Sequence, residues 1–308
     1  MHILQTSRRG RWLAIAWILA LASLQSQARD STDWVSDGQF TQGIEGPVVD
    51  RQGNLYAVNY RHQGTIGMVT GKDKGRVAIT LPDDSVANGL RFTADHGLLI
   101  ADYVNHNIWR FEPDSGELSL WAHHDDMHQP NDIAISASGR VYASDPDWRN
   151  SRGQLWMFSA DGRPHLVERE MGTTNGIEIS ADERYLYVNE SIQRRVWRYT
   201  LDVNGLPTNK QLVHTFADHG LDGMRSDVLG NLYIARYGAG QIVVMSPQGD
   251  ILRSYALKGA FPTNVAFGGC DGKTLYVTLQ KRGAIEKLQV ETAGRAFKLG
   301  TAGGHCEK

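Results

Sequence analysis

Six short polar motifs recur along the chain, and each begins with a side chain that can offer an oxygen atom to a ligand. Their first residues are spaced by 43, 43, 44, 47 and 42 positions, and they are Glu45, Asn88, Asn131, Asn175, Asp222 and Asn264. Asn-Gly and Asp-Gly pairs also form tight turns, which would explain any single copy. Turn formation does not explain, however, why one copy begins with a Glu or why Asn131 is followed by Asp132. Two carboxylates and several amides together suit a hard divalent cation, which prefers oxygen ligands.

The segments around these motifs predict how the six residues are positioned. Each motif opens a short apolar strand, and a Gly or Asp turn then leads to a second strand such as Leu98–Ala101 and a third such as Ile108–Phe111. A repeat of forty-odd residues is typical of a four-stranded propeller blade. No convincing helical periodicity follows the first thirty residues. We therefore predict an all-β, six-bladed β-propeller in a single domain over residues 29–308.

Blade geometry places the six residues in one ring. Each of them opens the innermost strand of its blade, so all six side chains should surround one mouth of the central channel. The last copy has no obvious outer strand. We therefore expect the segment N-terminal to the first copy, which includes residues 37–42, to close the ring.

Composition excludes several classes of protein. The 308 residues include 32 Lys and Arg against 34 Asp and Glu, with a formal net charge of -2 and 41% hydrophobic residues. The balance, without basic blocks, argues against a nucleic-acid-binding protein, and the apolar content is that of a globular chain. The 33 glycines suit a fold with many tight turns.

The N-terminus has the pattern of a secretory signal peptide. Arg8, Arg9 and Arg11 precede the apolar run Trp12–Leu24, which is shorter than the ~20 residues that span a bilayer. Small residues at Ser26 and Ala28 predict cleavage after Ala28, giving a signal peptide over residues 1–28 and a secreted or periplasmic protein. The alternative is a buried or membrane-anchoring helix.

Two cysteines fit the same compartment. Cys270 and Cys306 are the only ones in the chain, and an oxidising space favours a disulfide between them. That bond would fasten the C-terminal tail to the body of the protein. The alternative is a pair of free, buried thiols. Neither cysteine has the partners of a zinc site.

A second ring of side chains should lie beside the first. The end of each second strand is adjacent to the start of the first, because the two strands are antiparallel. This register gives Asn59, Asp102, Asp145, Glu190, Arg236 and Leu279. We interpret Asp145, Glu190 and Arg236 as substrate contacts, the alternative being solvated loop residues or salt bridges. Tyr103 and Trp148, just beyond the ring, would form aromatic walls for a ring-shaped substrate.

Histidines occur near the same mouth. Residues 123–128 read His-His-Asp-Asp-Met-His and lie in the loop that enters the third copy. Solvated loop residues explain this segment better than a metal cluster does, and a lid or a substrate contact is the other alternative. His219, three residues before Asp222, is a further candidate for substrate contact, or else a surface loop histidine.

These motifs resemble a known family. Glu45-Gly46-Pro47, Asn175-Gly176-Ile177 and Asp222-Gly223-Met224, together with Pro130-Asn131-Asp132 and the run 263–269, are similar to signatures of the gluconolactonase family that includes regucalcin. The resemblance implies lactone hydrolysis by a propeller with one divalent metal at the channel mouth. It further implies four ligands, with Asp222 also the catalytic carboxylate: Glu45, Asn131, Asn175 and Asp222.

The chain departs from that family at two positions. Gln129 stands where regucalcin-like members carry a substrate-binding Arg. Asp102-Tyr103 stands where gluconolactonase-like members often have an acidic residue followed by His. We therefore expect the metal site to be retained more closely than the sugar pocket, with Gln129 and Tyr103 among its substrate-binding residues.

The combined reading predicts a metal-dependent hydrolase that opens a sugar-type lactone. The cation, calcium first and otherwise Zn, Mg or Mn, would polarise the carbonyl, and Asp222 would deprotonate the attacking water. One rival is a hydrolase similar to diisopropylfluorophosphatase, in which Asp222 would be the nucleophile. The other is a non-catalytic propeller that binds sugar or protein and keeps calcium for structure. We expect a monomer that acts on a small molecule, with no nucleic-acid partner and no membrane contact after signal cleavage.

Overall fold

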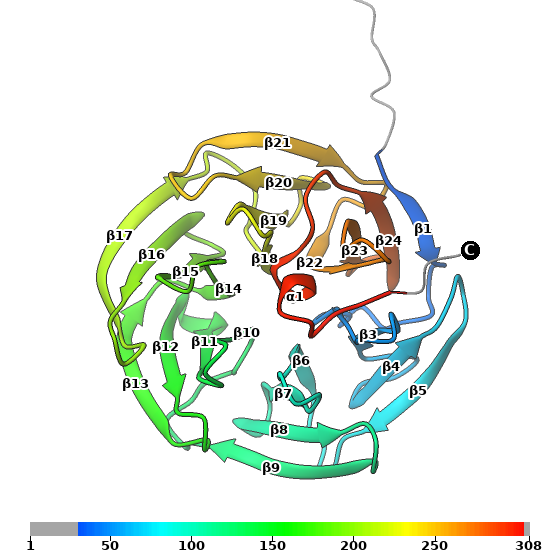
Figure 1. Ribbon diagram of the computed structural model, residues 1–308, viewed down its shortest axis with the longest axis horizontal. Coiled ribbons are helices and arrows are strands. Elements are labelled where there is room, and N and C mark those ends of the chain that lie inside the picture. Colours follow the sequence, from blue (N-terminus) through cyan, green and yellow to red (C-terminus); the bar gives the residue numbers. More distant parts are fainter. Residues whose placement is uncertain (1–29, 305–308) are drawn as a thin grey trace, which may run out of the picture.

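The computed structural model describes residues 30–304, in which six four-stranded antiparallel sheets surround a central axis (Figure 1). The predicted all-β, six-bladed propeller is therefore confirmed. Each sheet is one blade, with its strands in sequence order from the axis outward in blades one to five. The predicted signal peptide and Cys306 lie outside the described residues.

The first three blades contain the following strands. Blade one consists of β2 (Val48–Val49), β3 (Leu55–Val58), β4 (Thr65–Val69) and β5 (Gly75–Thr80). Blade two consists of β6 (Ala87–Phe92), β7 (Leu98–Asp102), β8 (Asn107–Glu112) and β9 (Glu117–His123). Blade three consists of β10 (Ile133–Ile135), β11 (Val141–Asp147), β12 (Arg152–Phe158) and β13 (Pro164–Met171), with the short 3-10 helix η1 (Trp148–Asn150) after β11.

The other three blades repeat this order. Blade four consists of β14 (Thr174–Ile179), β15 (Tyr185–Glu190), β16 (Arg195–Leu201) and β17 (Pro207–Thr215). Blade five consists of β18 (Met224–Ser226), β19 (Leu232–Arg236), β20 (Gln241–Met245) and β21 (Ile251–Ala256). Blade six consists of β22 (Pro262–Gly268), β23 (Thr274–Leu279), β24 (Ala284–Gln289) and, as its outer strand, β1 (Thr32–Val35).

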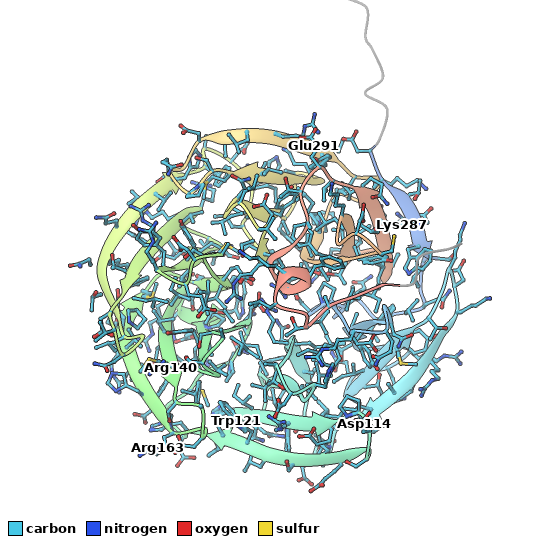
Figure 2. All side chains as sticks on the ribbon, in the orientation of Figure 1. Asp114, Trp121, Arg140, Arg163, Lys287 and Glu291 are labelled. Atoms are coloured by element: carbon cyan, nitrogen blue, oxygen red, sulfur yellow. The ribbon has the colours of Figure 1, made fainter. Side chains whose placement is uncertain are left out.

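Burial explains why the second strands read as continuous apolar runs. All five residues of β7 are buried, whereas β9 at the outer edge is mostly exposed or half-buried. The core lies between blades: Ile108 of blade two packs in one cluster with Ile133 and Trp156 of blade three. Charged side chains such as Asp114 and Arg163 lie at the periphery (Figure 2). Each blade is therefore stabilised by its neighbours.

The N-terminal segment closes the ring, as predicted. Strand β1 pairs antiparallel with β24, and Thr32 lies opposite Lys287. The closing residues are 32–35, slightly earlier than the 37–42 segment. The last blade therefore combines the two ends of the described chain, so that no blade of the ring lacks its fourth strand.

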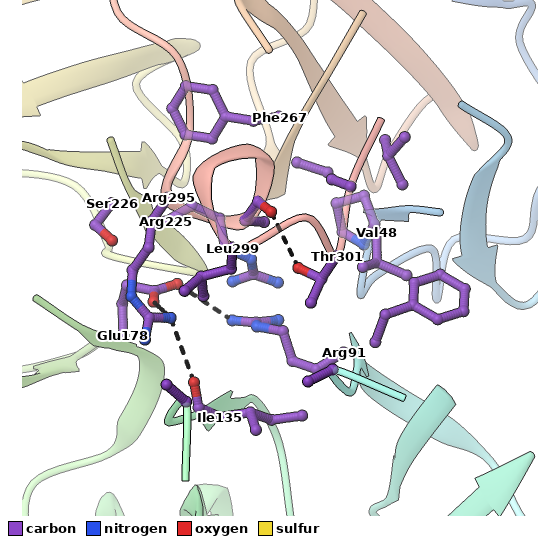
Figure 3. Close-up of a pocket in the computed structure, with 18 of the residues that line it drawn as sticks. Val48, Arg91, Ile135, Glu178, Arg225, Ser226, Phe267, Arg295, Leu299 and Thr301 are labelled. Carbon is purple, nitrogen blue, oxygen red and sulfur yellow. Dashed lines mark hydrogen bonds and ion pairs between the residues drawn. The ribbon is translucent and has the colours of Figure 1, made fainter. Parts of the chain in front are cut away.

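The C-terminal segment covers one end of the channel. Helix α1 (Arg295–Lys298) lies near the axis in Figure 1 and lines a cavity of about 170 Å³. Arg91, Arg225 and Glu178 also line this cavity (Figure 3). Asp132 lies 3.1 Å from Arg91 and 2.9 Å from Arg225, so these buried charges are paired. No helix within residues 30–304 is long and apolar enough to cross a membrane.

Candidate metal and substrate site

The residues that open the six polar motifs gather at the other end of the channel. A pocket of about 670 Å³ is lined by five of them: Glu45, Asn88, Asn131, Asn175 and Asp222. The side-chain amide of Asn264, the sixth residue, is hydrogen-bonded to other protein groups. Its Nδ2 donates to Glu45 Oε2 at 3.0 Å and to Asp132 Oδ2 at 3.3 Å, and its Oδ1 accepts from the amide of Val265. The predicted ring therefore forms, with Asn264 linking it to the buried ion pairs.

Glycines after these residues allow neighbouring blades to approach closely. A Cβ added at Gly89 would lie 2.7 Å from the carbonyl oxygen of Asn131, and one added at Gly176 would lie 2.5 Å from that of Asp222. Both distances are shorter than real Cβ contacts. Neither glycine has a positive φ. The Asn-Gly pairs thus serve the contact between blades at these positions, rather than turn formation.

The ring contains oxygen atoms that lack donors. Asn131 Oδ1 and Asn175 Oδ1 are buried and accept no hydrogen bond from the described residues. Asn175 is oriented by its Nδ2, which donates to Ser191 Oγ at 3.1 Å. Buried amide oxygens are normally paired. Other buried polar atoms of residues 30–304 also lack a partner, Gln154 Oε1 among them, but only Asn131 and Asn175 line the pocket. A cation would satisfy both.

The two carboxylates of the ring are held close together in the same buried place. Burial, followed by the charge of Asp132, raises the pKa of Glu45 to about 7. Burial and the charge of Glu45 raise the pKa of Asp222 well above its usual range. Carboxylates that repel each other and lack a counter-cation are stabilised by binding one. The residues present therefore fit a hard cation with two carboxylate and two amide ligands.

The ligand types differ from those of a zinc-type cluster. Residues 30–304 hold no group of three or more His, Cys, Asp or Glu side chains suited to a metal ion. A cation at this mouth would thus depend on the amide oxygens of Asn131 and Asn175. Oxygen-only ligation favours calcium over softer transition metals.

Four predicted substrate-binding residues line the pocket above the ring. They are Tyr103, Gln129, Trp148 and His219. Trp148 begins η1, and its side chain is 41% exposed, so that the indole is accessible at the rim. Aromatic side chains around a polar floor suit a ring-shaped substrate.

Asp145, Glu190 and Arg236 do not line the pocket, in contrast to their prediction as substrate contacts. Asp145 is fully buried and accepts from the amides of His128 and Gln129, at 2.8 and 2.6 Å, and from the indole of Trp156 at 3.0 Å. Glu190 accepts from the amide of Gly172 at 2.8 Å. Strand-end side chains thus bind the loop that enters their own blade.

Arg236 supports the loop that carries His219. Its Nη2 donates to the carbonyl oxygen of Asp218 at 2.7 Å and to its carboxylate at 2.9 Å. The guanidinium also lies 4.0 Å from the ring centre of Phe216. Arg236 is buried, whereas His219 faces the pocket. The function of Arg236 in this structure is to position the loop.

Sequence reasoning missed part of the pocket wall. The turn between β15 and β16 contributes Ser191, Ile192 and Arg194, and the following blades contribute Tyr237 and Gln280. A signal for three of them was present. Tyr103 follows the strand end at position 102, and the same one-residue offset after positions 190, 236 and 279 gives the further residues Ser191, Tyr237 and Gln280.

The histidine-rich loop makes contacts of its own. His123 Nδ1 lies 2.8 Å from Asn107 Oδ1, and its Nε2 lies 3.0 Å from Asp125 Oδ1. His128 Nε2 lies 2.7 Å from Gln154 Nε2. None of these histidines lines the pocket, although Gln129 beside them does. The segment therefore holds the loop that presents Gln129.

The fold and the pocket define a six-bladed propeller with an oxygen-rich site at one mouth. Comparison with known families agrees: the profile of the SMP-30/Gluconolactonase/LRE-like region matches residues 44–281. The chain belongs to this family.

Individual relatives give the extent of the similarity. The gluconolactonase of Zymomonas mobilis is 30% identical over 233 residues, which cover 68% of this chain and 64% of that protein. The diisopropyl-fluorophosphatase of Loligo vulgaris is 25% identical over 287 residues, 82% of this chain and 90% of the relative. The crystal structure of a calcium-binding protein, regucalcin, from Agrobacterium tumefaciens superposes with a TM-score of 0.75 at 22% identity, covering 86% and 95% of the two chains.

Proposed function

We propose that the protein is a divalent-cation-dependent lactonase that opens a sugar-type lactone. The observation that carries this proposal is the pair of unpartnered amide oxygens, Asn131 Oδ1 and Asn175 Oδ1, beside two buried carboxylates at the floor of an accessible pocket. Membership of a family that includes a gluconolactonase supports the choice of a lactone as substrate.

The four ring residues would hold the cation, which the oxygen-only ligands suggest is calcium. When bound, it supplies a Lewis acid that polarises the carbonyl and stabilises the developing oxyanion. Asp222 would orient the attacking water and accept its proton. Tyr103 and Trp148 would flank the sugar ring, and Gln129 would offer it hydrogen bonds.

A panel assay tests this function. The purified protein is incubated with neutral and acidic sugar lactones and with phosphotriesters, before and after removal of metal with a chelator and after addition of Ca²⁺, Mg²⁺, Mn²⁺ or Zn²⁺. We expect lactone hydrolysis that is lost with the chelator and restored most fully by Ca²⁺. No lactone hydrolysis with any of the four ions would refute the proposal.

A second candidate is a phosphotriesterase-type hydrolase. The match with the squid diisopropyl-fluorophosphatase, which spans 90% of that protein, favours it. In that case Asp222 would attack the substrate itself. A single turnover in ¹⁸O-labelled water tests this mechanism, because label enters the carboxylate of Asp222 only if a covalent Asp222 intermediate forms and water then attacks its carboxyl carbon. An unlabelled Asp222 is expected for the lactonase.

We also propose that the protein is exported and carries a disulfide. The N-terminal charge and hydropathy pattern supports removal of residues 1–28, and the two cysteines suit an oxidising compartment. N-terminal sequencing of secreted protein should begin at Arg29. Peptide mapping without reduction should recover the segments around Cys270 and Cys306 joined, and recovery of both as separate thiol peptides would exclude the bond.

A further inference from the structure

One cationic side chain at the rim of the pocket has no partner among residues 30–304. The charged side chains that line the pocket are Glu45, Asp222 and Arg194, with His219 as a further titratable group. Glu45 and Asp222 belong to the cation site described above. Arg194 is exposed, and its guanidinium makes no hydrogen bond or ion pair with the described residues. Arg236, by contrast, is paired with Asp218. The pocket therefore presents one unneutralised positive charge.

Hydrogen bonds hold the backbone that carries Arg194. Its φ is +58°, and its carbonyl oxygen accepts from the amide of Phe216 at 2.9 Å. The preceding Gln193 is held on both sides, since its Oε1 accepts from the amide of Thr173 and its Nε2 donates to the carbonyl of Ser151, each at 2.9 Å. The same turn contains Ser191, which contacts Asn175 of the ring. The position of Arg194 relative to the ring is thus built into blade four.

We infer that Arg194 forms a subsite for an anionic group, a carboxylate or phosphate, carried by the substrate at the end remote from its lactone carbonyl. This inference rests on the proposed function, because the carbonyl is assigned to the ring at the pocket floor. A planar guanidinium binds such oxyanions through two parallel N–H groups. Its free charge at the pocket mouth also attracts anionic ligands over neutral ones. The substrate class is therefore a sugar lactone with an acidic substituent.

Two lactones that differ at one carbon test this assignment. D-Glucaro-1,4-lactone carries a carboxylate where D-glucono-1,4-lactone carries a hydroxymethyl group. KM and kcat are measured for both on the calcium-loaded protein and on Arg194→Gln, Arg194→Lys and Arg195→Gln. Arg195 is a matched control, because it is an adjacent exposed arginine that does not line the pocket and makes no side-chain hydrogen bond or ion pair with the described residues.

The expected pattern is selective. Arg194→Gln should raise KM for the acidic lactone about tenfold, equivalent to ~1.4 kcal/mol, and change that for the neutral lactone less than twofold. The KM of Arg194→Lys for the acidic lactone should lie between those of wild type and Arg194→Gln, since lysine keeps the charge but lacks the planar guanidinium. Arg195→Gln should behave as wild type. Equal effects of Arg194→Gln on both lactones, or the same loss in Arg195→Gln, would overturn the inference.

Calorimetry separates this inference from the proposed function. Binding of the two lactones is also titrated directly, so that Arg194 is tested even if neither compound is hydrolysed. Tighter binding of the acidic lactone by wild type, lost in Arg194→Gln, supports the subsite whatever the turnover. Hydrolysis of the neutral lactone without any preference for the acidic one in binding would leave the lactonase standing and overturn the subsite.

Discussion

Asn131 and Asn175 each bury an amide oxygen that has no donor in the described part of the chain, and that arrangement is costly in a protein that binds nothing. A buried polar atom left unpaired costs ~1–3 kcal/mol. Asn264, in blade six of the same ring, shows the ordinary alternative, because its Oδ1 accepts a backbone amide and its Nδ2 donates to Glu45. The contrast distinguishes ligands from structural members of the same ring.

The first prediction follows from this contrast. Glu45→Gln and Asp222→Asn should each weaken Ca²⁺ binding at least tenfold, because each removes a negative charge from the ligand set. Asn264→Ala and Asn88→Ala should weaken it less, since neither oxygen is assigned to the cation. Calcium titration by calorimetry and the metal content after dialysis are measured for all four variants. Full occupancy in Glu45→Gln and Asp222→Asn would remove the basis for the site.

The second prediction concerns the buried loop anchor Asp145. Asp145→Ala leaves the amides of His128 and Gln129 and the indole of Trp156 without an acceptor, so the free energy of unfolding should fall by ~3 kcal/mol or more. Asp145→Asn keeps one acceptor oxygen and should cost less. Urea denaturation measures both variants.

Trp148→Ala is the matched control for this prediction. Trp148 lies in the same blade, but its side chain is 41% exposed, so its removal should change stability by less than ~1 kcal/mol. A loss in Trp148→Ala as large as in Asp145→Ala would contradict the anchor assignment.

The positions of the side chains that open each blade were predictable from the sequence. At the ends of the second strands, the positions were predictable but the contacts of the side chains were not. The repeat led to Glu45 and Asp222, which line the pocket, because a side chain with an oxygen atom recurs at one register. A charged residue after an apolar strand does not reveal whether its side chain points into the pocket or toward a loop. Asp145 accepts hydrogen bonds from loop amides, and Arg236 donates to Asp218. Such contacts depend on the path of a loop, which periodicity does not specify.

At the scale of elements, the C-terminal segment closes the channel with a buried charge. Arg295 of α1 is 7% exposed and reaches Glu183, the carbonyl of Ile135 at 3.3 Å and Glu178 at 3.8 Å. A helix of four residues has little stability of its own. Its placement therefore depends on these side-chain contacts and on packing.

The third prediction tests that dependence. Arg295→Gln removes one partner from a buried ion-pair network, so the free energy of unfolding should fall by ~3 kcal/mol. Lys298→Gln, in the same helix but exposed, should cost less than ~0.5 kcal/mol. Urea denaturation of both variants is the measurement. Equal stability of the two variants would show that the network contributes little to closing the channel.

For the whole molecule, the number of blades and the mode of closure could be read from the repeat, because six copies cannot bury their faces except against one another. The four-residue α1 and the three-residue η1 could not be predicted from the sequence, because neither is long enough to show helical periodicity. The buried arginine network was also missed. It joins Arg91, Asp132 and Arg225 from three different blades, and only closure of the ring brings them together.

The last prediction concerns that closure. A chain lacking residues 30–35 loses β1, which exposes the outer edge of β24 and removes the buried side chain of Val35 from its cluster with Phe40 and Ile285. An unpaired edge strand invites association, so we expect a lower Tm and aggregation relative to a chain that begins at Asp30. Differential scanning calorimetry and light scattering measure these changes.

Closure should also affect the cation site, because blade six contacts the residue before Glu45. Thr263 Oγ1 donates to the carbonyl oxygen of Ile44 at 3.0 Å, and Asn264 donates to Glu45 itself. Opening the ring loosens both contacts, so the shortened chain should bind Ca²⁺ more weakly although all four proposed ligands remain. Unchanged affinity in a folded, shortened chain would show that blade one positions Glu45 without the strand that completes the ring.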